Sequence, residues 1–176
     1  MTESIPQQAK ELEAGDHKAY MKFALSLTTN SPPKPTNYRV GAVVVDIATN
    51  EILATGYTLE LPGNTHAEQC CFEKLAAKYG IAASRIGEVL PNQVALYTTV
   101  EPCSQRLSGN LPCVDRILAI GNKIKTVYVG VHEPEKFVSD NSSKRKLEDA
   151  NIEFVHVPGL EKEILEVATA GHEKAS

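Results

Sequence analysis

The sequence predicts an α/β fold, in which helices pack on a β-sheet. Three observations support this prediction. Stretches rich in valine and isoleucine alternate with stretches of helical periodicity, glycines and prolines separate the two kinds of stretch, and no repeat or low-complexity tract interrupts them. The chain has 176 residues, of which 42% are hydrophobic and 23% charged, and this suits one compact domain with a real core. We therefore expect a polar N-terminal segment over residues 1–15 and a single domain over residues 16–176.

The first four predicted elements lie before residue 80. In chain order, they are a helix over 16–27, strands over 40–47 and 52–57, and a helix over 66–79. Asp16 opens the first helix, and three prolines within residues 30–35 stop it. The two strands pair across a turn that Thr49 and Asn50 supply. Gly80 ends the second helix, because glycine readily takes the left-handed conformation that follows a helix end.

The remaining six predicted elements alternate between strand and helix. They are strands over 94–100, 126–131 and 152–157, and helices over 112–120, 143–150 and 160–170. Gly121 ends the helix between the first two of these strands. That helical crossover requires the two strands to run parallel, so their C-terminal ends open on the same edge of the sheet. The last helix has apolar residues, Ile164, Leu165 and Val167, that can pack on the core or on a partner.

Charge and composition argue against a nucleic-acid or membrane protein. The net charge is −4 and the pI about 5.8, whereas binding to a phosphate backbone needs a clustered basic surface. The densest basic run, Lys144–Lys146, adjoins Glu148 and Asp149 and so predicts a solvated helix face. No apolar run approaches membrane-spanning length. We therefore expect a small-molecule substrate, with no nucleic-acid and no membrane partner.

The cysteines predict a reducing compartment. Cys70 and Cys71 are adjacent and form no obvious disulfide framework, and the other two cysteines are candidate metal ligands. Residues 1–15 are polar and lack the apolar stretch of a secretory signal. We expect a soluble, cytoplasmic protein, with the nucleus as the alternative.

Three short motifs together predict a catalytic zinc site. They are His66-Ala67-Glu68, Glu101-Pro102-Cys103, and Cys113 at the start of a predicted helix. One imidazole and two thiolates make three protein ligands, so a fourth coordination position stays open for water, as in catalytic rather than structural zinc sites. The sequence therefore predicts a Zn²⁺ ion bound by His66, Cys103 and Cys113. Glu68, which is not a ligand, is placed to act as the catalytic acid and base.

Both halves of this site lie at predicted helix starts. His66 and Glu68 occupy the first turn of one helix, and the two candidate cysteines bracket the entry to the next. Unpaired backbone N–H groups and the helix dipole favour negative charge at a helix start. Two converging helix starts would therefore help to hold both sulfurs as thiolates.

Each motif also has a purely structural interpretation. Thr65 and Glu68 have the spacing of a capping box at a helix start, and single cysteines are often buried core residues. Cys103 and Cys113 instead flank a polar segment that contains glycine and proline, and the combined pattern favours a metal site. Cys70 lies one helical turn after the histidine. We do not expect it to bind the metal, because a fourth ligand would leave no water for Glu68 to activate.

These motifs resemble those of the cytidine deaminase-like superfamily. The resemblance rests on His66-Ala67-Glu68, on Pro102-Cys103 and on the later cysteine, and it covers about residues 16–157. Most members separate their cysteines by two residues, whereas nine intervene here, over residues 104–112. This long segment and the run Leu61–Gln69 are similar to the riboflavin-pathway pyrimidine deaminases. They are most similar to the fungal-type diamino-ribitylamino-pyrimidinone phosphate deaminase.

The resemblance implies a fold, an assembly and a reaction. The fold is a three-layer α/β/α sandwich with a mixed five-stranded sheet, often assembled as a homodimer. The reaction is the zinc-dependent hydrolytic removal of an exocyclic amino group from a pyrimidinone that carries a ribityl phosphate chain, with release of ammonia, in riboflavin biosynthesis. The alternatives are deamination of cytidine, deoxycytidylate or guanine, and a non-catalytic zinc-binding scaffold. The intact Glu68 and the open coordination position favour an enzyme.

Several residues are expected to contact the pyrimidine substrate. They are Asn37, Ala67, Ser104, Arg106, Ser108, Asn110, His132 and Glu133. In related bacterial enzymes an asparagine before a Val-Gly strand start contacts the ring, and Asn37 fits that position, although it also suits a turn. Arg106 offers a planar fork for the phosphate and its neighbours offer hydrogen bonds, with a solvated loop as the alternative. His132 and Glu133 follow a predicted strand near the site, and ordinary polar surface residues are the alternative there.

Overall fold

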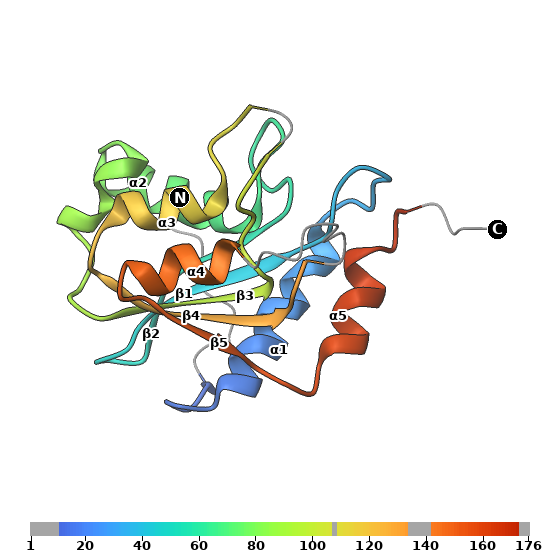
Figure 1. The fold of residues 1–176 in the computed structure, drawn as a ribbon, viewed down its shortest axis with the longest axis horizontal. Coiled ribbons are helices and arrows are strands. Elements are labelled where there is room, and N and C mark those ends of the chain that lie inside the picture. Colours follow the sequence, from blue (N-terminus) through green and yellow to red (C-terminus); the bar gives the residue numbers. More distant parts are fainter. Residues whose placement is uncertain (1–10, 107–108, 134–141, 173–176) are drawn as a thin grey trace.

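The computed structural model describes residues 11–106, 109–133 and 142–172 of the chain. Within these residues, five strands form one mixed sheet in the order β2-β1-β3-β4-β5 (Figure 1). The strands are β1 (Gly41–Asp46), β2 (Glu51–Tyr57), β3 (Val94–Val100), β4 (Ile124–Val131) and β5 (Glu153–His156). β1 runs antiparallel to β2 and β3, whereas β3, β4 and β5 run parallel to one another. The mixed sheet and the parallel pairing of β3 with β4 are confirmed.

Helices cover both faces of the sheet, as Figure 1 shows. In the described part of the chain they are α1 (His17–Leu27), α2 (Ala67–Tyr79), α3 (Cys113–Ile120), α4 (Ser142–Asp149) and α5 (Glu161–Ala168). α2, α3 and α4 pack on one face, and α1 and α5 pack on the other. The predicted three-layer α/β/α sandwich is therefore confirmed.

The central strands are buried because their side chains contribute to both layers. Alternate residues of a strand point to opposite faces. In β1, Ala42 and Val44 belong to the core that contains α2 and α3, whereas Val43 and Val45 belong to the core that contains α1. All seven residues of β3 are buried as well. Such strands appear in a sequence as continuous apolar runs, which makes them easy to predict.

Helix ends follow their capping residues. The Asp16 carboxylate accepts the N–H of Ala19 at 3.0 Å at the start of α1, and Gly80 takes a φ of 64° after α2. Two short 3₁₀ helices, Thr28–Asn30 and Ala83–Glu88, lie outside the predicted elements, because so short a helix has no apolar period long enough to detect. Among the described residues, no helix combines the length and apolar character needed to cross a membrane.

Candidate active site

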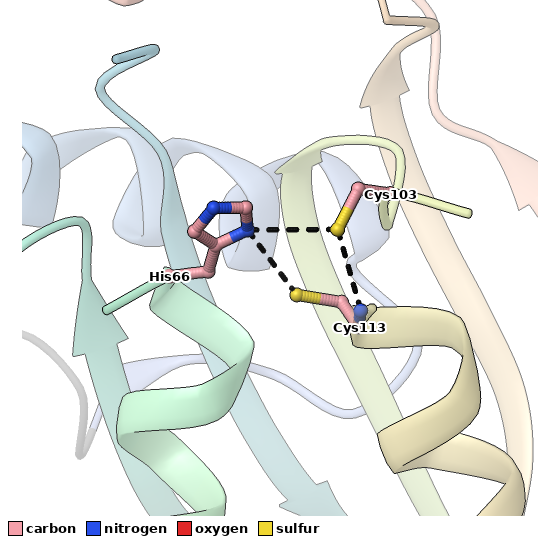
Figure 2. A group of neighbouring side chains, drawn as sticks. All are labelled: His66, Cys103 and Cys113. Carbon is pink, nitrogen blue, oxygen red and sulfur yellow. Dashed lines mark hydrogen bonds between the residues drawn. The ribbon is translucent and has the colours of Figure 1, made fainter. Parts of the chain in front are cut away.

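Three side chains that can bind a metal meet beyond the C-terminal end of β3 (Figure 2). One ligand atom from each of His66, Cys103 and Cys113 lies within 4.8 Å of the others. His66 Nδ1 is 3.6 Å from Cys103 Sγ and 3.5 Å from Cys113 Sγ. Figure 2 shows the imidazole facing both sulfurs. The fold thus brings the predicted ligands together from three separate parts of the chain.

Two helix starts and one strand end position this cluster. His66 is the N-cap of α2, Cys113 is the first residue of α3, and Cys103 follows β3. The backbone N–H of Cys113 donates to Cys103 Sγ at 3.3 Å, and the N–H of Val114 donates to the Cys103 carbonyl at 3.1 Å. The start of α3 is therefore fastened to the chain that leaves β3, where its N–H groups favour a negatively charged sulfur.

The start of α2 differs from the capping-box alternative. Thr65 Oγ1 donates to the carbonyl of Leu61 at 2.9 Å and does not cap the helix. Gln69 takes the third position of the helix, and its Oε1 accepts the N–H of His66 at 3.4 Å. The capping-box alternative requires Thr65 as the N-cap, but the N-cap is the next residue, His66, so this alternative is wrong by one residue. This register leaves Glu68 free to face the metal cluster.

The pKa values of the two thiols are shifted in opposite directions. Hydrogen bonds from the Cys113 thiol and from His66 lower the pKa of Cys103 to about 4, against the effect of burial. The pKa of Cys113 is raised, because its thiol donates to Cys103 and because it is buried. Metal binding displaces such thiol protons, and one nitrogen with two sulfurs is a donor set that fits Zn²⁺. Among the described residues, Cys70 is not part of this group.

Glu68 lies beside the cluster and is buried, with 3% of its surface exposed. The hydroxyl of Thr98 on β3 lies 3.0 Å from Glu68 Oε1 and 2.8 Å from the carbonyl oxygen of Val100, so these two acceptors share its proton. Cys113 Sγ lies 3.5 Å from Glu68 Oε2. Burial raises the pKa of Glu68, with a smaller opposing effect from His66. A carboxyl group with a raised pKa is suited to take up and release protons near neutral pH.

A cleft of about 240 Å³ opens onto this cluster. His66, Cys103 and Glu68 line it together with residues from several loops. The loop residues include Asn37 and Tyr38 before β1, Asn64 before α2, Glu101, Gln105 and Arg106 after β3, and Glu133 after β4. The metal cluster is thus reached through an opening with both polar and apolar walls, the latter including Val40 and Val100.

The predicted substrate-binding residues divide into three groups. Asn37, Arg106 and Glu133 line the cleft. Four other predicted residues that the structure describes do not line the cleft: Ala67, Ser104, Asn110 and His132. Ser108 lies outside the described residues. For each of them, contact with a substrate stays a prediction.

Three of the residues away from the cleft have other partners. Ser104 Oγ accepts a hydrogen bond from a serine of α4 at 2.8 Å. Ala67 is fully buried where α2 meets β2, and a Cβ on Gly56 would lie 2.2 Å from its carbonyl oxygen. Only glycine lets the strand approach the helix start this closely. His132 Nδ1 is 3.4 Å from Oε2 of buried Glu101.

Eight lining residues fall outside the predicted set. They are Thr36, Tyr38, Val40, Thr58, Asn64, Val100, Glu101 and Gln105. Glu101 and Gln105 lie within two residues of the predicted ligand Cys103, so their closeness to that motif is a signal that could have found them. Asn64 lies two residues before the predicted ligand His66 and carries the same signal. Tyr38 belongs to a loop that only the folded structure brings to the site.

A sheet that brings two helix starts onto one His-Cys-Cys cluster, with a buried glutamate beside it, defines the class of zinc deaminases. The chain belongs to the cytidine and deoxycytidylate deaminase family, whose zinc-binding region matches residues 14–131. This match includes all three clustered ligands. The predicted superfamily and the expected zinc cofactor are confirmed.

The comparisons also identify similar individual proteins. The chain is 36% identical over 157 residues to the diaminohydroxyphosphoribosylamino-pyrimidine deaminase of Schizosaccharomyces pombe, a match that covers 89% of this chain and 36% of the relative. It is 47% identical to Aspergillus oryzae Rib2 deaminase, whose C-terminal deletion mutant has a crystal structure with a TM-score of 0.82. That match covers 89% of this chain and 92% of the other. A structure of the same Rib2 deaminase in complex with DARIPP is 46% identical, with a TM-score of 0.81 and the same coverage. The predicted resemblance to riboflavin-pathway pyrimidine deaminases is confirmed.

Proposed function

We propose that this protein hydrolytically deaminates diamino-ribitylamino-pyrimidinone phosphate, a riboflavin precursor, and releases ammonia. The observation that carries the proposal is the cluster of His66 and two cysteines beside buried Glu68, reached through a cleft that the long inter-cysteine segment helps to line. The 47% identity to Rib2 deaminase and the 36% identity to the S. pombe deaminase support this substrate class. The Rib2 structure in complex with DARIPP gives further support.

The proposed reaction depends on an activated water and a mobile proton. When bound, zinc would supply a water whose pKa is lowered from that of bulk water to about 7. Glu68 accepts a proton from this water and delivers it to the ring nitrogen beside the carbon that bears the amine. Glu68 would then take the remaining proton from the added hydroxyl group and pass it to the departing nitrogen. The water oxygen stays on the ring, and the nitrogen leaves as ammonia.

The polar residues of the cleft are proposed to hold the substrate. The Asn37 amide is offered to the ring, and the Arg106 guanidinium to the phosphate. The Arg106 guanidinium donates to the Asn64 carbonyl at 2.6 Å and to Gln69 Oε1 at 3.1 Å. These two bonds hold its plane at the cleft and support a binding role. Glu133 lines the same cleft and is proposed as a further contact.

Replacing Thr98 with valine is expected to lower kcat about fivefold to tenfold. Valine has nearly the shape of threonine but lacks the hydroxyl that donates to Glu68 Oε1, so the carboxylate loses its fixed orientation. KM and zinc content should stay unchanged, and Thr98→Ser should restore kcat. Steady-state ammonia release measures both constants. A valine variant with the wild-type kcat would contradict the positioning role of this hydroxyl.

Ammonia release from a panel of amines tests the proposed substrate. The panel contains the ribityl pyrimidinone phosphate, cytidine, deoxycytidylate and guanine, each assayed with and without a chelator. We expect chelator-sensitive release from the first compound alone. Release from one of the other three would replace the proposed substrate, and release from none by zinc-loaded protein would support the scaffold alternative. Complementation of a riboflavin auxotroph that lacks this deaminase tests the same proposal in cells.

We also propose that the protein is a single-domain homodimer of the cytoplasm. Cys103 and Cys113 must stay reduced to bind zinc, which supports a reducing compartment. The frequent homodimers of the resembling deaminases support the assembly. Light scattering of the purified protein should give a mass of about twice the 19.1 kDa of one chain.

A further inference from the structure

The end of α5 and the segment that follows it, residues 169–172, lie against the loop of residues 33–39, which carries Asn37 and Tyr38. The backbone N–H of Arg39 donates to the carbonyl of Ala168 at 3.1 Å. The His172 imidazole Nε2 is 2.9 Å from the carbonyl oxygen of Asn37 and can donate to it. Two segments that are 135 residues apart in the sequence are therefore joined beside the cleft.

Ring packing and a close backbone approach add to this contact. The rings of His172 and Tyr38 lie with their centroids 4.9 Å apart and their planes tilted by 55°. A Cβ on Gly171 would lie 2.3 Å from the backbone nitrogen of Lys34 and 2.6 Å from the carbonyl carbon of Pro33. The absence of a side chain at this glycine lets the segment lie directly on the loop.

The segment has a firm support, because α5 is anchored in the core. Ile164 and Ala168 of α5 are almost completely buried, with 1% and 0% of their surfaces exposed. A Cβ on Gly130 of β4 would lie 2.3 Å from Ile164 Cδ1, so this side chain packs directly on the sheet. The position of the segment after α5 is therefore tied to the sheet.

The loop held in this way forms part of the cleft. Asn37 and Tyr38 line the cleft together with His66 and Glu68. The Asn37 side chain also donates to Asn64 Oδ1 at 2.8 Å, and Asn64 lies just before the metal-binding His66. A shift of the backbone at Asn37 would therefore move both its amide and the Tyr38 ring relative to the cluster.

We propose that His172 is a positioning residue, which holds the loop of Asn37 and Tyr38 in place and thereby sets the affinity for the substrate. His172 does not itself line the cleft, so it acts through the backbone of Asn37. Because this loop is not part of the metal cluster, loss of the contact should change KM rather than kcat. The kinetic part of this inference rests on the proposed deaminase function, whereas the structural part does not.

Three substitutions separate the hydrogen bond from the ring packing. His172→Ala removes both, His172→Phe keeps a ring against Tyr38 without the donor, and His172→Gln keeps an N–H group at a similar reach. His156→Ala is the matched control. His156 Nε2 also contacts a backbone carbonyl, that of Gly130 at 3.0 Å, and lies 3.3 Å from Glu161 Oε1. His156 lies on β5 and does not line the cleft, and Glu161 is at the opposite end of α5 from the segment of His172.

We expect KM to rise about fivefold in His172→Ala and in His172→Phe, with kcat and zinc content within about twofold of wild type. His172→Gln should bring KM back to within about twofold of wild type, and the control should match wild type. Hydrogen exchange supplies a readout that needs no turnover. Backbone amides of Lys34 and of residues 36–39 should exchange faster in His172→Ala and at the wild-type rate in His156→Ala.

An unchanged exchange rate at Lys34 and residues 36–39 in His172→Ala would overturn the positioning role, whether or not the protein is active. An unchanged KM in an active His172→Ala enzyme would overturn its effect on the substrate. If the wild-type protein is inactive on every amine but His172→Ala exchanges faster, the positioning role stands and the proposed function fails.

Discussion

Replacing Glu68 with glutamine is expected to lower kcat by a factor of about one hundred to ten thousand, while zinc stays bound. The amide keeps the shape of the side chain and can still accept the Thr98 hydroxyl, but it cannot take up a proton from water. Glu68 is not one of the clustered ligands, so the metal content should not change. Steady-state ammonia release and elemental analysis of the same sample measure the two effects.

The matched control for this prediction is Glu73→Gln. Glu73 lies on the same helix and accepts Gln69 Nε2 at 3.0 Å, but it does not line the cleft. Its kcat should stay within about twofold of wild type. A zinc-loaded Glu68→Gln variant with wild-type turnover would falsify the acid–base role.

Replacing Cys113 with serine is expected to release the metal and abolish turnover. A serine hydroxyl stays protonated near neutral pH and is a far weaker zinc ligand than a thiolate. Bound zinc after dialysis against a mild chelator should fall from about one ion per chain to less than about one tenth. The value of kcat should fall below about one thousandth of wild type. Elemental analysis and ammonia release measure both losses.

Cys70→Ser is the matched control for the ligand prediction. Cys70 is fully buried on α2 but lies outside the cluster, so this variant should keep its zinc. Added zinc should raise the thermal midpoint of the metal-free wild type and of metal-free Cys70→Ser, because a ligand that binds only the folded state stabilises it. It should not raise that of Cys113→Ser. Loss of zinc from Cys70→Ser alone would mean that the ligand set is wrong.

The elements that are easiest to predict from the sequence are those buried on both sides. β3 has the predicted bounds, Val94–Val100, and every residue in it is buried. β5 is shorter than predicted and covers Glu153–His156. It lies at the edge of the sheet with β4 as its neighbour, so its ends are set by pairing with that strand rather than by its own apolar residues.

The metal cluster could be found in the sequence because few residue types can perform its chemistry. The walls of the cleft could be found only in part. The sequence predicts Asn37, Arg106 and Glu133, which do line it, but contacts between distant segments form the rest. Tyr38 lines the cleft where the loop before β1 meets the segment after α5, and no spacing in the chain records that meeting. Ser104 directly follows a predicted ligand, yet its hydroxyl bonds to α4. His172 is the extreme case, since its partner Asn37 is 135 residues away.

The separation of the ligands along the chain has a consequence for folding. His66 and Cys113 are 47 residues apart, at the starts of two helices that pack on the same face of the sheet. A dication between them would act as a cross-link that closes a loop of the chain, and this loop includes the central strand β3. A cross-link restricts the unfolded chain more strongly when the loop that it closes is longer. Chelation should therefore loosen α2 and α3 first and leave the opposite layer, with α1 and α5, as the more durable half of the protein.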